Sequence, residues 1–464
     1  MLRLLFSVAV LLLPFASHAE SAPPNFILIC CDDLGYGDLG CYGSPTIRTP
    51  HLDRMAAEGI RFTDFYSAAE VCSPGRAALL TGRYPIRSGM VPGPLGKRVL
   101  FPQSKGGLPD SEITIAEALR PKGYTSAHVG KWHLGIHPGS RPLDQGFDQS
   151  FGLPYSNDMD GRPGLPKGIA ASPNPPADGW NVPLLRDGNI VEQPADQTTL
   201  TKRYTEEALA FIKAQTQRET PGTKKPFFLY LAHTFPHVPL FSSPNFKGKS
   251  RAGIYGDAVE EIDWSTGQIL ETLRQTGLAE NTLVLFTSDN GPWLTQGEQG
   301  GGAGPFREGK GSTWEGGMRV PGIVWMPGRI APRIHQSPVG TLDVLPTFLA
   351  MAGAAMPNDV ILDGSDLSAL LFEDKQIAER PFFYYRGSEL YACRLGEWKV
   401  HFKTQSAYGK DPAISHEPPH LYHLGHDLGE SRNLAADHPE VIARIREAVA
   451  AHRPGIVPGV AQFD

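Results

Sequence analysis

Apolar runs alternate with helical patterns along most of this chain, and the alternation predicts its fold class. Four apolar runs have the length and continuity of buried strands, and they cover residues 25–31, 124–132, 226–234 and 282–288. Between them, apolar side chains recur at helical spacing over residues 204–212 and 259–273. Buried strands interleaved with helices form mostly parallel sheets that helices cover on both faces. We therefore expect an α/β fold with a mostly parallel central sheet.

The pattern changes after about residue 370, where shorter runs replace the long buried ones. Residues 380–386, 390–395 and 398–402 indicate short antiparallel strands, with a turn at Gly396-Glu397. A last helix is expected from His438-Pro439. The chain thus divides into a main domain at residues 20–370 and a small α+β C-terminal domain at residues 371–464. Within the main domain, Pro, Gly and Asn at residues 154–196 indicate a long surface excursion.

The first residues have the composition of an export signal. Arg3 precedes an apolar stretch at residues 4–15, and Ser17-His18-Ala19 forms a small-x-small cleavage site. The apolar stretch is shorter than the ~20 residues that a membrane span needs, and no later segment is apolar enough. We therefore expect residues 1–19 to be a signal peptide and the mature protein to have no stable membrane insertion. The sequence contains no Asn-x-Ser/Thr sequon, which favours a bacterial periplasmic or secreted protein.

Charge and cysteine content narrow the classes of function. The net charge of -6 and pI of about 6.2 argue against nucleic-acid binding but allow a local basic pocket. Five cysteines are few for an exported protein of this size. Cys30 and Cys31 lie in an apolar run and are expected to pack in the core. Cys41 could pair with Cys393 or with Cys30 in a disulfide, and the sequence leaves open whether either disulfide forms.

Cys72 lies where a helix is expected to begin. Pro74 suits a first helical turn, and Ala77-Ala78-Leu79-Leu80 propagates a helix well. The positive end of this helix and Arg76 would hold an anion against residue 72. A lone cysteine in this setting would usually be a buried structural thiol.

Acidic side chains directly follow two of the predicted strands. Asp32-Asp33 come after residues 25–31, and Asp289-Asn290 come after residues 282–288. Because parallel strands bind ligands at their carboxyl ends, we expect these side chains to converge. Three carboxylates and an amide suit Ca²⁺ or Mg²⁺ better than Zn²⁺. Either pair alone would be explained equally well as a turn or a helix cap.

Basic side chains and histidines follow in three further segments. Lys131 and His133 are two residues apart, so an extended backbone would point both the same way. His237 stands in a Pro-His-Val-Pro sequence that would hold its ring rigidly, and His233 is the competing candidate. Residues 304–311 almost spell a phosphate-binding loop, but Gly311 replaces the expected hydroxyl residue and no buried strand leads directly into the motif.

Together these segments resemble the type I sulfatases. The resemblance is carried by Cys72-x-Pro74-x-Arg76 with Leu80-Thr81-Gly82-Arg83, by Gly130-Lys131-Trp132-His133, and by the segment from Gly309 to Gly317 that contains Lys310. One departure is Gly75, where the family usually has serine or alanine. The branch resembles arylsulfatase A and N-acetylgalactosamine-6-sulfatase, and residues 255–263, 298–301 and 383–387 are more similar to the latter. The implied fold is the alkaline-phosphatase-like sandwich, with an antiparallel sheet in the C-terminal domain.

The resemblance also implies a chemistry. Cys72 would be oxidised by a formylglycine-generating enzyme, and the formylglycine hydrate would attack the sulfur of a sulfate ester. The implied roles are calcium binding by Asp32, Asp33, Asp289, Asn290 and residue 72, sulfate neutralisation by Arg76, Lys131 and Lys310, protonation of the leaving alcohol by His237 or Lys310, re-formation of the aldehyde through His133, and sulfate binding by Ser156, Lys131, His237 and Lys310.

The expected substrates are aryl sulfates and sulfated carbohydrates of the galactose or N-acetylgalactosamine 6-sulfate type. A eukaryotic source would imply a lysosomal enzyme, and a homodimer is compatible with the sequence. One alternative is a phosphodiester or phosphonate hydrolase on the same fold, although no second His and Asp cluster supplies a two-metal site. The other is a non-catalytic protein that binds sulfated glycans, which would have no use for an intact Cys-x-Pro-x-Arg motif.

Overall fold

A mixed sheet of 11 strands runs through the centre of the protein in the order β10-β2-β9-β8-β1-β7-β3-β4-β5-β6, with β11 paired to β2. The computed structural model describes residues 23–217, 225–408 and 411–464, so the predicted signal peptide lies outside the described residues. The strands are β1 (Asn25–Cys31), β2 (Ile60–Tyr66), β3 (Thr125–Gly130), β4 (Gln149–Gly152), β5 (Leu184–Arg186), β6 (Asn189–Glu192), β7 (Phe227–Ala232), β8 (Thr282–Ser288), β9 (Arg319–Trp325), β10 (Arg333–His335) and β11 (Val339–Gly340).

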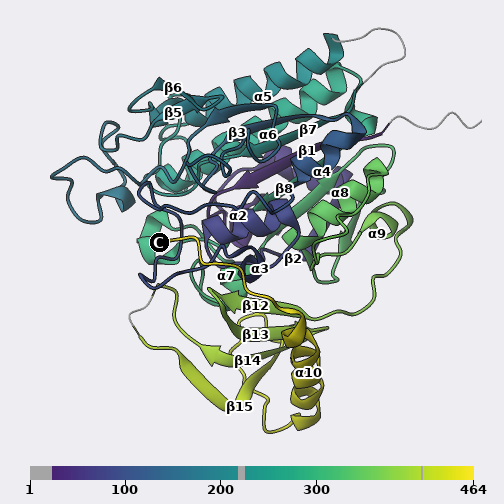
Figure 1. Cartoon of the computed structure of the whole chain (residues 1–464). Helices are drawn as coiled ribbons and strands as arrows, with labels where there is room; N and C mark the ends of the chain where they lie inside the picture. Colours follow the sequence, from purple (N-terminus) through teal and green to yellow (C-terminus); the bar gives the residue numbers. More distant parts are fainter. Residues whose placement is uncertain (1–22, 218–224, 409–410) are drawn as a thin grey trace, which may run out of the picture.

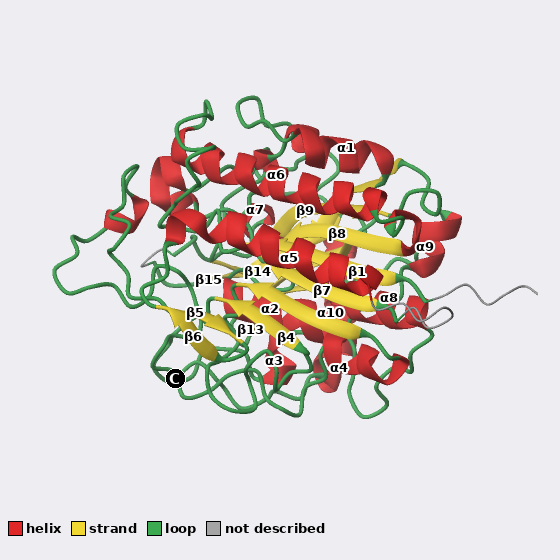
Figure 2. Ribbon diagram, turned by 90° about the horizontal axis from the view of Figure 1, so that it is seen from above, coloured by secondary structure: helices red, strands yellow, loops and turns green. Residues whose placement is uncertain are grey.

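The central strands β8-β1-β7-β3-β4 are parallel, and helices cover both faces of the sheet (Figures 1 and 2). Along β1, Ile27 and Ile29 face one layer while Phe26 and Leu28 face the other, as the period of a strand requires. The first layer contains α1 (Pro50–Glu58), α5 (Leu200–Gln217) and α6 (Gly253–Gln275). The second contains α2 (Cys72–Thr81), α4 (Ile115–Leu119), α8 (Val344–Ala352) and α9 (Ser368–Glu373). Two short helices, α3 (Pro85–Ser88) and α7 (Glu315–Met318), lie in connections.

A second, antiparallel sheet lies below the first in Figure 1. Its order is β12-β13-β14-β15, and α10 (Pro439–His452) packs Ile442, Ile445 and Val449 against it. The strands are β12 (Phe382–Arg386), β13 (Glu389–Leu395), β14 (Trp398–Thr404) and β15 (Ile414–His423).

Buried charges join the two sheets. We call Asp64, Glu315, Arg319, Arg394 and Lys399 the interface cluster; all five are buried. Lys399 Nζ lies 2.9 Å from Glu315 Oε1 and 3.0 Å from Glu430 Oε1. Arg394 NH1 lies 2.6 Å from Asp64 Oδ1, and Arg319 NH2 lies 2.8 Å from Asp64 Oδ2. Each charge in this cluster therefore faces an opposite charge.

The structure confirms the predicted fold class and its main elements. The four predicted buried strands are β1, β3, β7 and β8, the helical patterns are α5 and α6, and three of the four C-terminal strands were expected. The sequence pattern did not reveal β2 or β9. In β9, Pro321 and Gly322 interrupt the strand pattern. Pro321 is tolerated opposite an irregularity of β2 between Phe62 and Phe65. The 154–196 segment is more than a surface excursion, since β5 and β6 in it extend the sheet.

The cysteines and the helices answer two questions left by the sequence. All five cysteines lie in the described residues and are free, so the disulfide considered for Cys41 is absent. Among the described helices, none has both the length and the apolar character that a membrane crossing requires.

Candidate active site

Four oxygen-bearing side chains meet where β1 and β8 end. The strands are parallel and in register, with Cys31 opposite Ser288, so the residues after them emerge side by side. Asp33 has a φ of 65°, which turns the chain sharply after β1. Asn290 Nδ2 donates to Asp33 Oδ1 at 2.7 Å, and the Asp33 amide donates to Asp289 Oδ1 at 3.3 Å. The predicted convergence of the two Asp-containing segments is therefore observed.

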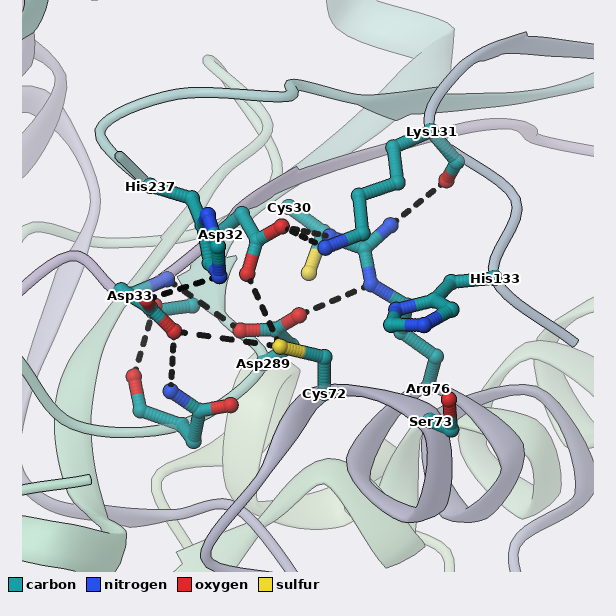
Figure 3. Close-up of polar contacts among 12 residues, drawn as sticks. Cys30, Asp32, Asp33, Cys72, Ser73, Arg76, Lys131, His133, His237 and Asp289 are labelled. Carbon is teal, nitrogen blue, oxygen red and sulfur yellow. Dashed lines mark hydrogen bonds and ion pairs between the residues drawn. The ribbon is translucent and has the colours of Figure 1, made fainter. Parts of the chain in front are cut away.

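Cys72 brings its sulfur to the same place from the first position of α2 (Figure 3). Its Sγ lies 3.2 Å from Asp32 Oδ1 and 3.1 Å from Lys310 Nζ. Burial, followed by the charge of Asp32, raises the pKa of the thiol well above its ordinary value. Since the thiolate is the reactive form of cysteine, an unmodified Cys72 is a poor nucleophile.

Gly75 lets α2 approach β8 closely. A Cβ at this position would lie 2.4 Å from the main-chain oxygen of Asp289. The same oxygen accepts a hydrogen bond of 2.5 Å from Ser67 Oγ. The departure at Gly75 therefore has a local reason, because a side chain there would press on the residue that carries the Asp289 carboxylate.

Three buried cations face the carboxylates. Arg76 Nε donates to Asp289 Oδ2 at 2.8 Å, and its NH1 donates to the main-chain oxygen of Lys131 at 2.6 Å. Lys131 Nζ bonds to Asp32 and donates to Ser156 Oγ at 3.0 Å. Lys310 Nζ lies 2.6 Å from Asp33 Oδ1. Arg76 was expected to face an anion at residue 72, but in the structure it holds Asp289 and the end of β3.

The donor set fits a divalent cation. Burial raises the pKa of Asp33 to about 7 and that of Asp289 to about 6, so the chain alone does not keep both carboxylates fully charged at neutral pH. A nearby divalent charge would favour their ionised forms. Ligand atoms of Asp32, Asp33, Cys72 and His237 all lie within 4.8 Å of one another. The buried Oδ1 of Asn290 has no hydrogen-bond partner among the described residues, so this oxygen is available to a cation.

The histidines occupy different positions around this cluster. His133 Nε2 lies 2.8 Å from the main-chain oxygen of Leu100, which makes Nε2 the donor and leaves Nδ1 unprotonated and without a partner. His237 Nδ1 lies 2.5 Å from the oxygen of Val238, and its Nε2 lies 3.6 Å from Asp33 Oδ2. Burial lowers the pKa of His237 to about 3 and that of His133 well below its ordinary value. His233 contacts Ser265 instead and lies outside the cavity lining.

Lys131 and His133 do not lie on an extended backbone, so the predicted reason for their shared direction is wrong. Strand β3 ends at Gly130, and His133 has a φ of 59°, so the segment is not extended. Gly130 itself has a φ of 119°, a conformation that favours glycine. A Cβ there would lie 1.8 Å from the main-chain oxygen of Ala232. The glycine thus lets the chain leave β3 where strand geometry would otherwise continue.

A cavity of about 410 Å³ opens over the cluster. Cys72, His133, Ser156, His237 and Lys310 line it, as predicted side chains. The rest of the cavity lining consists of residues that the sequence did not mark as functional, and it includes Leu95, Lys97, Arg98, Phe101, Asp158, Met159, Trp293 and Tyr408. A larger cavity of about 860 Å³ lies near β10 and the second sheet, and no predicted site residue lines it.

The comparisons with known proteins define the class. Residues 24–354 match the Sulfatase family model, and residues 378–464 match the C-terminal region of aryl-sulfatase. The chain therefore belongs to the sulfatase family, whose members hydrolyse sulfate esters, and it is a sulfuric ester hydrolase.

The chain is similar to two human sulfatases and to two solved structures. The chain is 43% identical to arylsulfatase A of Homo sapiens, with 95% of this chain and 89% of the relative covered. It is 41% identical to N-acetylgalactosamine-6-sulfatase of Homo sapiens, with 95% and 88% covered. The PsFucS1 sulfatase from Pseudoalteromonas sp. superposes with a TM-score of 0.81 at 29% identity, with 94% and 91% covered. Ps i-CgsB in complex with k-i-k-neocarrahexaose gives 0.77 at 29% identity, with 95% and 94% covered.

Proposed function

We propose that this enzyme hydrolyses sulfate monoesters of carbohydrates, using formylglycine at position 72 and a bound calcium ion. The observation that carries the proposal is the position of Cys72 Sγ, within 3.2 Å of both a carboxylate and an ammonium group in the cavity. Its sulfur marks where the oxygens of a formylglycine hydrate would lie. When present, formylglycine supplies the nucleophilic oxygen and calcium neutralises sulfate charge.

The charged residues of the chain divide into ligands and positioning groups. Asp32, Asp33, Asp289 and Asn290 would hold the calcium ion, together with the modified residue 72. Arg76 orients Asp289 through its 2.8 Å contact, so its role is to position a metal ligand. Lys131 and Lys310 provide positive charge for the sulfate oxygens, and Ser156 orients Lys131.

Proton transfer is assigned from the charge states of the chain. Burial alone would lower the pKa of Lys310, but Asp33 and Cys72 outweigh it and hold that pKa well above its ordinary value. Lys310 therefore carries a proton at neutral pH, whereas His237 is neutral, and we assign protonation of the leaving alcohol to Lys310. His237 then binds sulfate as a neutral ring. His133, with Nδ1 unprotonated, serves as the base that restores the aldehyde.

The substrate class follows from the relatives. One relative is an N-acetylgalactosamine-6-sulfatase, and one similar solved structure is a complex with k-i-k-neocarrahexaose. A galactose or N-acetylgalactosamine 6-sulfate, free or at the end of a glycan, is the proposed natural substrate, with aryl sulfates as model substrates. An exported enzyme, periplasmic or secreted in a bacterium, would meet such glycans outside the cytoplasm.

Maturation requires a partner. Cys72 is only 2% exposed, so a formylglycine-generating enzyme would reach it before the chain is fully folded. The modifying enzyme would therefore act on an unfolded segment, and the side chains of the site would close around residue 72 afterwards.

Mass analysis of the peptide that carries residue 72 tests the proposal. Protein from its native host should show the sulfur of Cys72 replaced by an aldehyde, and Cys72→Ala should lower turnover of 4-nitrophenyl sulfate by more than about 1000-fold. Cys41→Ala is the matched control and should retain turnover. An unmodified thiol in active native protein would refute the proposal, and faster cleavage of the matched aryl phosphate would favour the phosphatase alternative.

A further inference from the structure

A rigid turn projects one acidic side chain into the cavity. In the turn at residues 154–160, the Met159 amide donates to the Ser156 oxygen at 3.1 Å. Asn157 Nδ2 donates to Gln197 Oε1 at 2.9 Å and to the Pro239 oxygen at 3.0 Å. Tyr155 donates to Asp160 at the ends of the turn. The side chains around Asp158 are therefore fixed by contacts with the rest of the protein.

Asp158 itself has no such contact. Its carboxylate makes no hydrogen bond or ion pair with any described residue, and its Oδ1 is buried without a partner. It is also the one acidic side chain among the described residues that line the cavity. A carboxylate that is partly desolvated and unpaired is costly, so its retention in a preformed turn calls for a partner from outside the chain.

The chemistry of a carboxylate limits that partner. An ionised carboxylate only accepts hydrogen bonds, and it repels a second anion. The partner therefore carries a hydroxyl or an amide N–H beside the sulfate ester. Trp293 and Tyr408 line the same cavity with ring centroids 5.3 Å apart, and aromatic faces of this kind suit the apolar face of a sugar ring.

We propose that Asp158 selects the sugar portion of the substrate by accepting a hydrogen bond from a hydroxyl or acetamido N–H of the ring that bears the sulfate. The proposal rests on the proposed function, because it takes the sulfate to be bound at residue 72. Asp158 touches the leaving group away from the sulfur and takes no part in proton transfer. An aryl sulfate, which has no such donor, gains nothing from Asp158.

The test compares two esters on the same variants, using protein whose residue 72 is shown by mass to be formylglycine. The esters are 4-nitrophenyl sulfate and the 6-sulfate of 4-nitrophenyl N-acetyl-β-galactosaminide or β-galactoside, the latter followed by sulfate release. In Asp158→Ala, kcat/KM for the sugar ester should fall about 10- to 100-fold, the range for a lost hydrogen bond to a charged acceptor. The aryl ester should change by less than about threefold. Asp158→Asn should recover part of the loss, since its amide oxygen still accepts.

The control and the contradicting outcomes separate this proposal from the proposed function. Asp178→Asn changes a carboxylate in the same excursion whose side chain is 76% exposed, and it should leave both esters unaffected. Equal losses on both esters, or no loss on the sugar ester, would each overturn the role of Asp158. Cleavage of the aryl ester alone by the unaltered enzyme would instead overturn the carbohydrate substrate class of the proposed function. Failure of the modified enzyme to cleave either ester would instead overturn the proposed function.

Discussion

Two buried groups of charges lie in this enzyme, and they differ in how completely their polar atoms are paired. The candidate active site contains three carboxylates and three cations, yet Arg76 NH2, His133 Nδ1 and Asn290 Oδ1 have no hydrogen-bond partner. In the interface cluster, Asp64, Glu315, Arg394 and Lys399 are fully paired within the described residues. The two groups of charges are similar in burial and composition. The candidate active site keeps unpaired polar atoms that can bind a ligand, whereas the interface cluster uses its charges to hold the two sheets together.

The largest expected effect on stability appears when one lysine of the interface cluster and one lysine of the candidate active site are each replaced by methionine. Lys399→Met leaves Glu315 and Glu430 buried beside fewer positive charges, and it should lower the free energy of unfolding by about 3–5 kcal/mol. Lys310→Met should cost less stability, because Asp33, whose burial raises its pKa to about 7, can take up a proton once the ammonium is gone. Urea unfolding of both variants at pH 7 measures the difference.

Turnover should show the opposite order for these two variants. Lys310→Met should reduce kcat/KM on 4-nitrophenyl sulfate by at least about 100-fold, since it removes charge from the reacting position. Lys399→Met, assayed below its unfolding temperature, should retain most of its turnover. The contrast between the clusters would be wrong if both variants lost stability and turnover to the same extent.

A smaller effect is expected from Gly75→Ala. Although alanine favours a helix by about 1 kcal/mol over glycine, its Cβ would press on the Asp289 oxygen 2.4 Å away. The net result should be a loss of about 1–3 kcal/mol in unfolding free energy, with lower calcium affinity measured by calorimetry. Gly455→Ala, where a Cβ would meet nothing within 4 Å, is the control and should not destabilise the protein.

The last effect is spread over a range of pH and concerns His401, which lies 2.7 Å from Glu430 beside the interface cluster. Burial, followed by the charge of Lys399, lowers the pKa of His401 to about 4, below the value of about 6.5 expected in the unfolded chain. The unfolded chain therefore takes up the proton first, and stability from His401 is lost as pH falls from about 6.5 to 4. The slope is about 1.4 kcal/mol per pH unit.

His401→Gln isolates this contribution. The stability difference between wild type and variant should shrink on going from pH 7 to pH 5, as measured by urea unfolding. A difference that stays constant over this range would mean that the pKa of His401 is the same in the folded and unfolded chains, and a difference that grows would mean that folding holds His401 protonated.

The sequence predicted the parts of the site that depend on neighbouring strands. Asp32-Asp33 and Asp289-Asn290 could be placed together because parallel strands in register end at one edge. Trp293, Tyr408 and Asp158 could not, since each reaches the cavity on a loop whose path depends on distant contacts. Tyr408, for example, comes from the connection between β14 and β15, and its ring packs at a tilt against that of Trp293, 115 positions earlier in the numbering.

The partners of buried charges were also beyond sequence reasoning. Arg76 was placed correctly at the start of α2, but its choice of Asp289 and the Lys131 oxygen depends on how closely α2 packs on β8. The interface cluster had no local signal at all, because Glu315 is in α7 and Lys399 is in β14, 84 positions further along the chain. The pairing of distant charges is a property of packing, which residue spacing does not record.

The contact between Glu315 and Lys399 has a consequence for exchange of genetic segments between sulfatases. The first family match ends at residue 354 and the second begins at residue 378, so the stretch between them is a simple place to join two parent sequences. A chimera made there would inherit Glu315 from one parent and Lys399 from the other, and the loop carrying Lys310 would be anchored only if the charges still matched. A chimera of the two sheets would therefore keep this contact only if both parents carry matching charges at these two positions.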